Sequence, residues 1–202
     1  MAQSNSDLPC TECGFTHQCI CALIPKLSCD LDIVLLMHPN ECGRATNTGK
    51  LLQKSLPNCS SFTWDRRDAP EGFLAHISRK NVEPFIIFPS EESLSIQKVT
   101  ENQSKKKHVY IILDGTWQEA RKMVRKSSWL SDIPMVSLSS IGSSSDYTLR
   151  RNQEQGNLCT LEVGCELLKA QGERQQASNL REFFSHYLRV FQADRSGHQL
   201  KQ

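Results

Sequence analysis

The sequence lacks a membrane-spanning segment, because no apolar run approaches the roughly 18 residues that a bilayer requires. Its amino-terminal segment, residues 1–7, has neither the basic nor the apolar part of a secretory signal peptide. No internal repeat is present. We therefore expect a cytoplasmic protein without a membrane partner, and nothing in the sequence implies a protein partner.

The common phosphate-binding and hydrolase motifs are also missing. The sequence contains no Walker lysine motif, no GxGxxG and no GxSxG, which excludes the usual nucleotide and serine-hydrolase sites. A strong charge of one sign is absent too, since 24 Lys and Arg face 22 Asp and Glu. Any basic surface for nucleic acid must therefore be local. A chain of 202 residues predicts one sizeable core with small appendages.

Continuous apolar runs predict buried strands over residues 32–38, 84–89, 108–113 and 134–138. Such runs are typical of a parallel sheet with helices on both faces. We expect helices over residues 46–54, from Ser90-Glu91-Glu92, from Trp117, over 158–170 and over 175–191, and a serine-rich loop over 139–151. In the helix that begins at Trp117, the side chains of Trp117, Ala120 and Val124 are expected to share one face. The alternation predicts an α/β fold, with a mainly parallel sheet flanked by helices.

The four predicted strands end at or beside His38, Phe88-Pro89, Asp114 and Leu138. In parallel sheets, ligands bind at the carboxyl ends of the strands. We therefore expect four loops to line one crevice.

The sharpest local motif is Asp114-Gly115-Thr116-Trp117, directly after the strongest strand. A capped turn also explains it, with Asp114 or Thr116 accepting backbone N–H bonds at the helix start. An aspartate just outside a central strand is nevertheless well placed for catalysis, and the tryptophan could wall a base or a cofactor. We interpret this motif as the functional centre.

Side chains that suit phosphates, sugars or amide edges occur in His38-Pro39-Asn40-Glu41 and Asn47-Thr48-Gly49. An ordinary strand-to-helix loop is the alternative. Basic residues follow the central motif and the fourth strand, and they could hold phosphates or be solvated faces only. They are Arg121, Lys122, Arg125, Lys126, Arg150 and Arg151.

Four of the nine cysteines lie within twelve residues, as Cys10-x2-Cys13-x5-Cys19-x-Cys21. Four thiolates suit a closed tetrahedral zinc site, which would be structural because it leaves no open coordination position. An iron–sulfur cluster or free thiols are the alternatives. We expect residues 1–29 to form a polar tail and zinc module and residues 30–195 to form the catalytic domain.

Together these motifs resemble the DTW-domain family of tRNA-uridine aminocarboxypropyltransferases, whose D-x-T-W motif Asp114-Gly115-Thr116-Trp117 matches. The resemblance extends in the family's order from about residue 9 to 190. It takes in the cysteine cluster, residues 38–41, residues 47–51, Tyr147-x-Leu149-Arg150 and Thr160-Leu161-Glu162. Cys159 departs from it, because serine is expected there.

The resemblance implies a SPOUT-like fold with a C-terminal knot that holds S-adenosylmethionine (SAM). The implied reaction transfers the 3-amino-3-carboxypropyl group of SAM to N3 of a tRNA uridine and releases methylthioadenosine. Asp114 would act as the base or orient the uracil, with Thr116 and Trp117 beside it. A SPOUT-type RNA methyltransferase and a non-catalytic zinc-containing RNA-binding module are the alternatives.

The resemblance also implies the ligand contacts. SAM would contact Thr48, Phe88, Pro89, Leu138, Leu158 and Thr160, whereas tRNA would contact His38, Asn47, Arg121, Lys122, Arg125, Arg150 and Arg151.

Overall fold

The computed structural model describes residues 8–102, 104–138 and 158–201. Within them, one sheet has the strand order β2-β1-β5-β3-β6-β4, and every neighbouring pair is parallel. The strands are β1 (Asp32–Met37), β2 (Asn58–Thr63), β3 (Val82–Ile87), β4 (Leu94–Ser95), β5 (Lys107–Asp114) and β6 (Met135–Ser137). The α-helices are α1 (Gly49–Ser55), α2 (Glu71–Ile77), α3 (Ile96–Glu101), α4 (Trp117–Lys126), α5 (Thr160–Ala170) and α6 (Arg174–Arg195). Short 3-10 turns are η1 (Cys21–Leu23), η2 (Pro39–Glu41) and η3 (Ser128–Leu130).

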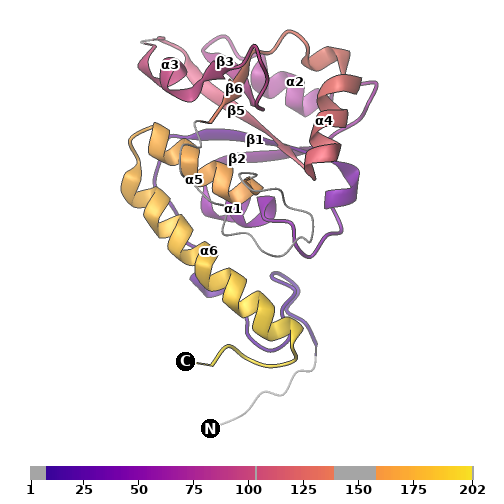
Figure 1. Ribbon diagram of the computed structural model, residues 1–202, viewed down its shortest axis with the longest axis vertical. Coiled ribbons are helices and arrows are strands. Elements are labelled where there is room, and N and C mark those ends of the chain that lie inside the picture. The colour runs from indigo at the N-terminus through magenta and orange to yellow at the C-terminus, as the bar shows by residue number, and fades with distance from the viewer. Residues whose placement is uncertain (1–7, 103, 139–157, 202) are drawn as a thin grey trace.

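Helices cover both faces of the sheet, as the continuous apolar runs predicted (Figure 1). Ile33 and Leu35 of β1 point into a core with α1, α3, α5 and α6, whereas Val34 and Leu36 point into a core with α2 and α4. Successive residues of a strand face opposite sides of the sheet. Because helices cover both sides, all four side chains are buried. The expected α/β fold with a parallel sheet is confirmed.

The sequence analysis missed β2, α2 and the two-residue strand β4. β2 is an edge strand, Asn58-Cys59-Ser60-Ser61-Phe62-Thr63, and its side chains are only partly buried or exposed. It therefore lacks the apolar run of a central strand. The short helix α2 buries a single side chain, Phe73, which is too little to produce a periodic pattern.

The predicted helix start at Ser90-Glu91-Glu92 is wrong. These residues form a turn, in which Ser93 N donates to Ser90 O at 3.2 Å. The chain then adds the two-residue strand β4 to β6 before α3 begins, with Ser95 as its N-cap. The polar start signal is present, but pairing with β6 delays the helix by six residues.

The predicted strand over 84–89 begins earlier, at Val82, and contains Pro84. The ladder between β3 and β6 starts only at Ile86, so Pro84 has no strand beside it on that side. Proline fits a strand there because its missing N–H leaves no ladder bond unmade.

The later helices agree with prediction apart from their ends. On α4 the buried residues are Ala120 and Met123, while Trp117 and Val124 are half-buried. The face predicted from Trp117, Ala120 and Val124 therefore omitted its most buried member. Between α5 and α6, Gly172 takes a φ of 84°, which favours glycine and lets the chain reverse.

The sheet topology has a switch point between β1 and β5. From β1 the chain passes through α1 to β2 on one side, whereas from β5 it passes through α4 to β6 on the other. Loops that diverge from neighbouring parallel strands leave a crevice at the carboxyl edge of the sheet. Met37 and Asp114, the last residues of β1 and β5, are paired at that edge.

The cysteine segment shares a core with the rest of the chain. Phe15, Ile20, Ile24 and Leu27 belong to the cluster that includes α5 and α6. The division into residues 1–29 and 30–195 stays a prediction. So does the knot, which depends on the path of residues 139–157, outside the described residues. In the part of the chain described, no helix has the length and apolar character needed to cross a membrane.

Candidate functional site at the carboxyl edge

Asp114 is the buried centre of the site. Its carboxylate ends β5 at the switch point and is only 3% exposed. Asn47 Nδ2, from the loop after β1, donates to Asp114 Oδ2 at 2.7 Å. Thr160 Oγ1, at the start of α5, donates to Asp114 Oδ1 at 2.6 Å. Segments separated by 67 and 46 residues in the chain therefore meet on one carboxylate.

Gly49 allows the loop after β1 to approach this closely. A Cβ atom at Gly49 would lie 2.7 Å from Asp114 Oδ2 and 3.3 Å from Asn47 Oδ1. Neither partner is the free end of a flexible side chain, since both are hydrogen-bonded. The glycine of Asn47-Thr48-Gly49 is required by this contact, not by its backbone angle.

Asn47 joins two carboxylates. Its Nδ2 also donates to Glu41 Oε2 at 3.1 Å, and its Oδ1 accepts from Lys50 N at 3.0 Å. Both amide hydrogens are therefore used within the protein, and the residue is only 4% exposed. The structure places Asn47 inside the site, whereas the sequence suggested an RNA contact.

Arg44 links the two loops that flank Asp114. Its guanidinium donates to both carboxylate oxygens of Glu119 at 2.9 Å and also binds Glu41, which is completely buried. Two parallel bonds of this kind fix both distance and orientation. Burial alone raises the pKa of Glu119, but the bonds from Arg44, Thr116 and Asn40 outweigh it and hold that pKa well below its usual value.

Thr116 begins α4 with a capping box. Its Oγ1 accepts from Glu119 N at 3.2 Å, and Glu119 Oε2 accepts from Thr116 N at 2.8 Å. The capped turn considered for this motif is thus present, formed by Thr116 and not by Asp114. The sequence analysis missed Glu41, Arg44 and Glu119 as site residues. The Thr116-x-x-Glu119 spacing was a signal for Glu119, but no local pattern marks Arg44.

His38 is buried behind this network. Its ring stacks on Trp64 at a centroid distance of 5.3 Å, and its Nδ1 accepts from Asn40 N at 3.3 Å. Trp64 Nε1 in turn donates to Ser127 Oγ at 2.8 Å, beyond the end of α4. His38 therefore supports the loop after β1 from within.

The residues predicted to contact SAM all lie at the carboxyl edge, in two groups. Thr48 and Thr160 adjoin Asp114, and Thr48 Oγ1 accepts from Leu161 N at 3.4 Å. Phe88 lies beside Trp117, with ring centroids 6.0 Å apart. Pro89 is exposed, while Leu138 and Leu158 are half-buried where β6 ends and α5 approaches. The aromatic faces of Phe88 and Trp117 suit a ligand that carries a base or a cation.

Cys159 is half-buried at the start of α5. Its backbone N–H donates to Glu162 Oε2 at 2.8 Å. Burial, the largest effect, and the nearby Glu162 charge raise the pKa of the thiol well above its ordinary value. A thiol that stays neutral is a poor nucleophile. The position where serine was expected therefore serves the helix start.

The predicted RNA contacts differ in their placement. Arg121, Lys122 and Arg125 are exposed on α4, next to the site. Arg150 and Arg151 lie outside the described residues.

The four clustered cysteines gather around one point, with all ligand atoms within 4.8 Å of one another. The Sγ atoms of Cys10 and Cys19 are 3.7 Å apart, those of Cys10 and Cys21 3.8 Å, and those of Cys13 and Cys19 3.9 Å. A tetrahedron with metal–sulfur bonds of about 2.3 Å has edges of about 3.8 Å. A disulfide would need about 2.05 Å. The cluster fits a tetrahedral metal ion.

The chemistry of the cluster points the same way. Backbone N–H groups of Cys13 and Glu12 lower the pKa of Cys10 to about 6, whereas burial and the neighbouring sulfurs raise that of Cys21 to about 12. A cation between the sulfurs would be needed for all four to be thiolates near neutral pH. The intervening loop is anchored to α6, where Asp194 Oδ1 accepts from Thr16 N at 2.9 Å and His17 N at 2.7 Å.

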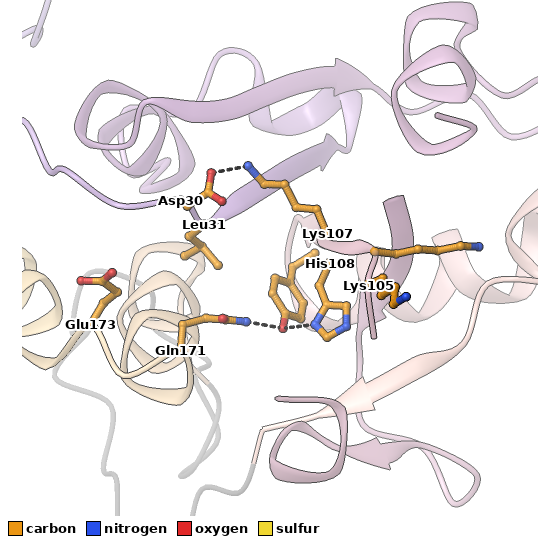
Figure 2. Close-up of a pocket in the computed structure, with 9 residues that line it drawn as sticks. Asp30, Leu31, Lys105, Lys107, His108, Gln171 and Glu173 are labelled. Atoms are coloured by element: carbon orange, nitrogen blue, oxygen red, sulfur yellow. Dashed lines mark hydrogen bonds and ion pairs between the residues drawn. The ribbon is translucent and has the colours of Figure 1, made fainter. Parts of the chain in front are cut away.

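A cavity of about 410 Å³ lies at the opposite edge of the sheet, near the starts of β1 and β5 (Figure 2). Gln171 Nε2 donates to Tyr110 Oη at 2.7 Å, and the same Tyr110 Oη lies 3.4 Å from His108 Nδ1. Lys107 pairs with Asp30 across its rim. The cavity is thus separated from Asp114 by the length of β5.

The fold and site define an α/β protein with a buried carboxylate at the switch point of a parallel sheet. The DTW domain model matches residues 8–192, and the chain belongs to the DTW domain family, which confirms the resemblance. The chain is 26% identical over 156 residues to tRNA-uridine aminocarboxypropyltransferase 2 of Drosophila melanogaster, covering 74% of this chain and 61% of that protein. It is 28% identical over 162 residues to the protein of that name from Macaca fascicularis, covering 76% and 53%.

The chain thus spans between half and two thirds of the length of these relatives. No solved structure matches it.

Proposed function

We propose that the protein modifies tRNA, transferring the 3-amino-3-carboxypropyl group of SAM to N3 of a uridine. The observation that carries the proposal is Asp114, buried at the switch point and held by Asn47 and Thr160, from two segments that resemble the family's motifs. The names of the two relatives supply the reaction class. Zn²⁺ is the proposed structural metal of the cysteine cluster.

When bound, SAM supplies a sulfonium leaving group and an electrophilic Cγ carbon. N3 of uracil loses its proton to water and bonds to Cγ. The Cγ–S bond breaks, and the electron pair of that bond stays on sulfur, so the sulfonium leaves as neutral methylthioadenosine. The protein must therefore align N3 with Cγ and support the departure of the proton.

We assign the orienting role to Asp114. Two protein donors already hold its carboxylate, an arrangement that fixes direction and suits alignment of the uracil imide. Trp117 and Phe88 would form the wall for the sulfonium and adenine, since an aromatic face attracts a cation. Thr116 acts through the start of α4, and Asn47 and His38 act by holding the loop after β1.

The reaction is tested by incubating the protein with SAM and unmodified tRNA. Methylthioadenosine and an aminocarboxypropylated uridine are the expected products. Release of S-adenosylhomocysteine would instead identify a methyltransferase. If neither by-product forms, the protein is a non-catalytic RNA-binding module.

The role of Asp114 is tested by Asp114→Asn. An asparagine can still accept from Asn47 and, if the Thr160 hydroxyl reverses, donate to Thr160, so both contacts can persist without the charge. We expect a folded protein with at least about a 100-fold lower rate of methylthioadenosine release. Asp132→Asn, at an exposed aspartate after η3, is the matched control. Full activity of Asp114→Asn would contradict the assignment.

A further inference from the structure

Every charged residue on the exposed face of α4 is a cation, and the remaining exposed residue is the neutral Gln118. Arg121, Lys122, Arg125 and Lys126 are all exposed, while the opposite face packs into the core through Ala120 and Met123. The helix contains one acidic residue, Glu119, and its carboxylate is bound to Arg44. Residues four apart lie about 6 Å from each other along a helix, so the cations form two short rows.

Two further cations lie on the loop after β2, which contacts the end of this helix through Trp64. Trp64 follows β2 and donates to Ser127 Oγ at 2.8 Å, which fixes the loop after β2 against the end of α4. Arg66 and Arg67 occur two and three residues further on and are exposed. Asp65 turns this loop, since its Oδ1 accepts from Arg67 N at 2.7 Å and Asp68 N at 3.1 Å. Its carboxylate is therefore directed into the turn.

Six exposed cations, four on α4 and two on the loop that Trp64 holds against its end, make up what we call the basic strip: Arg66, Arg67, Arg121, Lys122, Arg125 and Lys126. Within the residues that the structure describes, no ion pair joins any of them to a carboxylate. Asp65, Asp68 and Glu71, all exposed, are the acidic neighbours on the loop side, and the charge of Arg67 contributes to a lowered pKa of Asp65 after the bonds from the Arg67 and Asp68 N–H groups. The α4 part of the strip begins one turn from Trp117.

We propose that the basic strip binds the phosphate backbone of the RNA substrate and extends the RNA surface beyond α4 to Arg66 and Arg67. This inference rests on the proposed function, because that function supplies the polyanion. The exposed residues of the strip include no aromatic side chain on which a base could stack. The strip therefore contributes affinity and orientation, and recognition of the uridine remains at Asp114.

The test measures the dissociation constant for unmodified tRNA by fluorescence anisotropy across a range of salt concentrations, without SAM. Each phosphate contact contributes about 0.7 to 0.9 to the slope of log K against log salt. Arg66→Ala/Arg67→Ala and Arg125→Ala/Lys126→Ala should each weaken binding and flatten the slope by about one to two units. Arg66→Lys/Arg67→Lys keeps the charge and should keep the slope.

Lys105→Ala/Lys106→Ala is the matched control, because it removes two exposed cations at the opposite edge of the sheet. Its slope should equal that of the unchanged protein. An unchanged slope for Arg66→Ala/Arg67→Ala, or an equal loss in the control, would overturn the inference. The inference would also be overturned if the alanine variants lost binding to phosphatidylserine vesicles but kept their binding to tRNA.

Binding and turnover separate this inference from the proposed function. Strip-dependent tRNA binding without methylthioadenosine release supports the strip and contradicts the reaction. Turnover with an unchanged salt slope in both alanine variants supports the reaction and contradicts the strip.

Discussion

The contact between Gly49 and Asp114 offers a sensitive test of the site, through Gly49→Ala. The added Cβ would lie 2.7 Å from Asp114 Oδ2, so the carboxylate must retreat by about 0.7 Å to reach an ordinary contact of 3.4 Å. Overpacking of this kind costs about 1–3 kcal/mol, and the better helix propensity of alanine offsets up to about 1 kcal/mol of it. We therefore expect a net loss of about 1–2 kcal/mol, a 5- to 30-fold fall in the ratio of folded to unfolded protein.

Activity should fall further than stability, because the displaced group is Asp114 itself. A shift of this size at a reacting centre lowers the rate about 10- to 100-fold. The assays are urea unfolding and methylthioadenosine release. Gly43→Ala is the matched control, since Gly43 is exposed and its Cβ would contact nothing within 4 Å. If Gly49→Ala matched Gly43→Ala in both assays, the close approach described here would be refuted.

Three further predictions concern the network and the metal. Asn47→Asp places a third carboxylate between Glu41 and Asp114, and we expect urea unfolding to show a loss of at least about 3 kcal/mol, whereas equal stability would contradict the contacts. Because the folded pKa of Glu119 is lowered from 4.5, its stabilisation is present above pH 4.5 and is lost as the pH falls below it. Arg44→Met should make that loss smaller in urea titrations at successive pH values, and an unchanged pH dependence would count against the ion pair. For the cysteine cluster, elemental analysis of protein purified without chelator should find one zinc per chain, and its removal should lower the melting temperature; metal-free protein of equal stability would refute the structural role.

Much of the central fold follows from local sequence pattern. β1, β5 and the helices after them were predictable because their apolar residues are continuous or recur at helical spacing. β2 and α2 were not, because an edge strand and a helix with one buried side chain carry little apolar pattern. The Ser90 helix start failed because pairing of β4 with β6 is a long-range event that local signals do not encode.

The site divides in the same way. The sequence alone determined that Asp114 follows a central strand, that four cysteines lie close enough in the chain to share a metal, and that polar motifs follow β1. Only the tertiary structure decided that Asn47 and Thr160 hold Asp114, that Arg44 joins Glu41 to Glu119, and that the loop carrying Arg66 and Arg67 contacts the end of α4 through Trp64. The physical reason is that apolar periodicity and motif spacing are local properties. A hydrogen bond between residues 67 positions apart depends instead on which strands become neighbours.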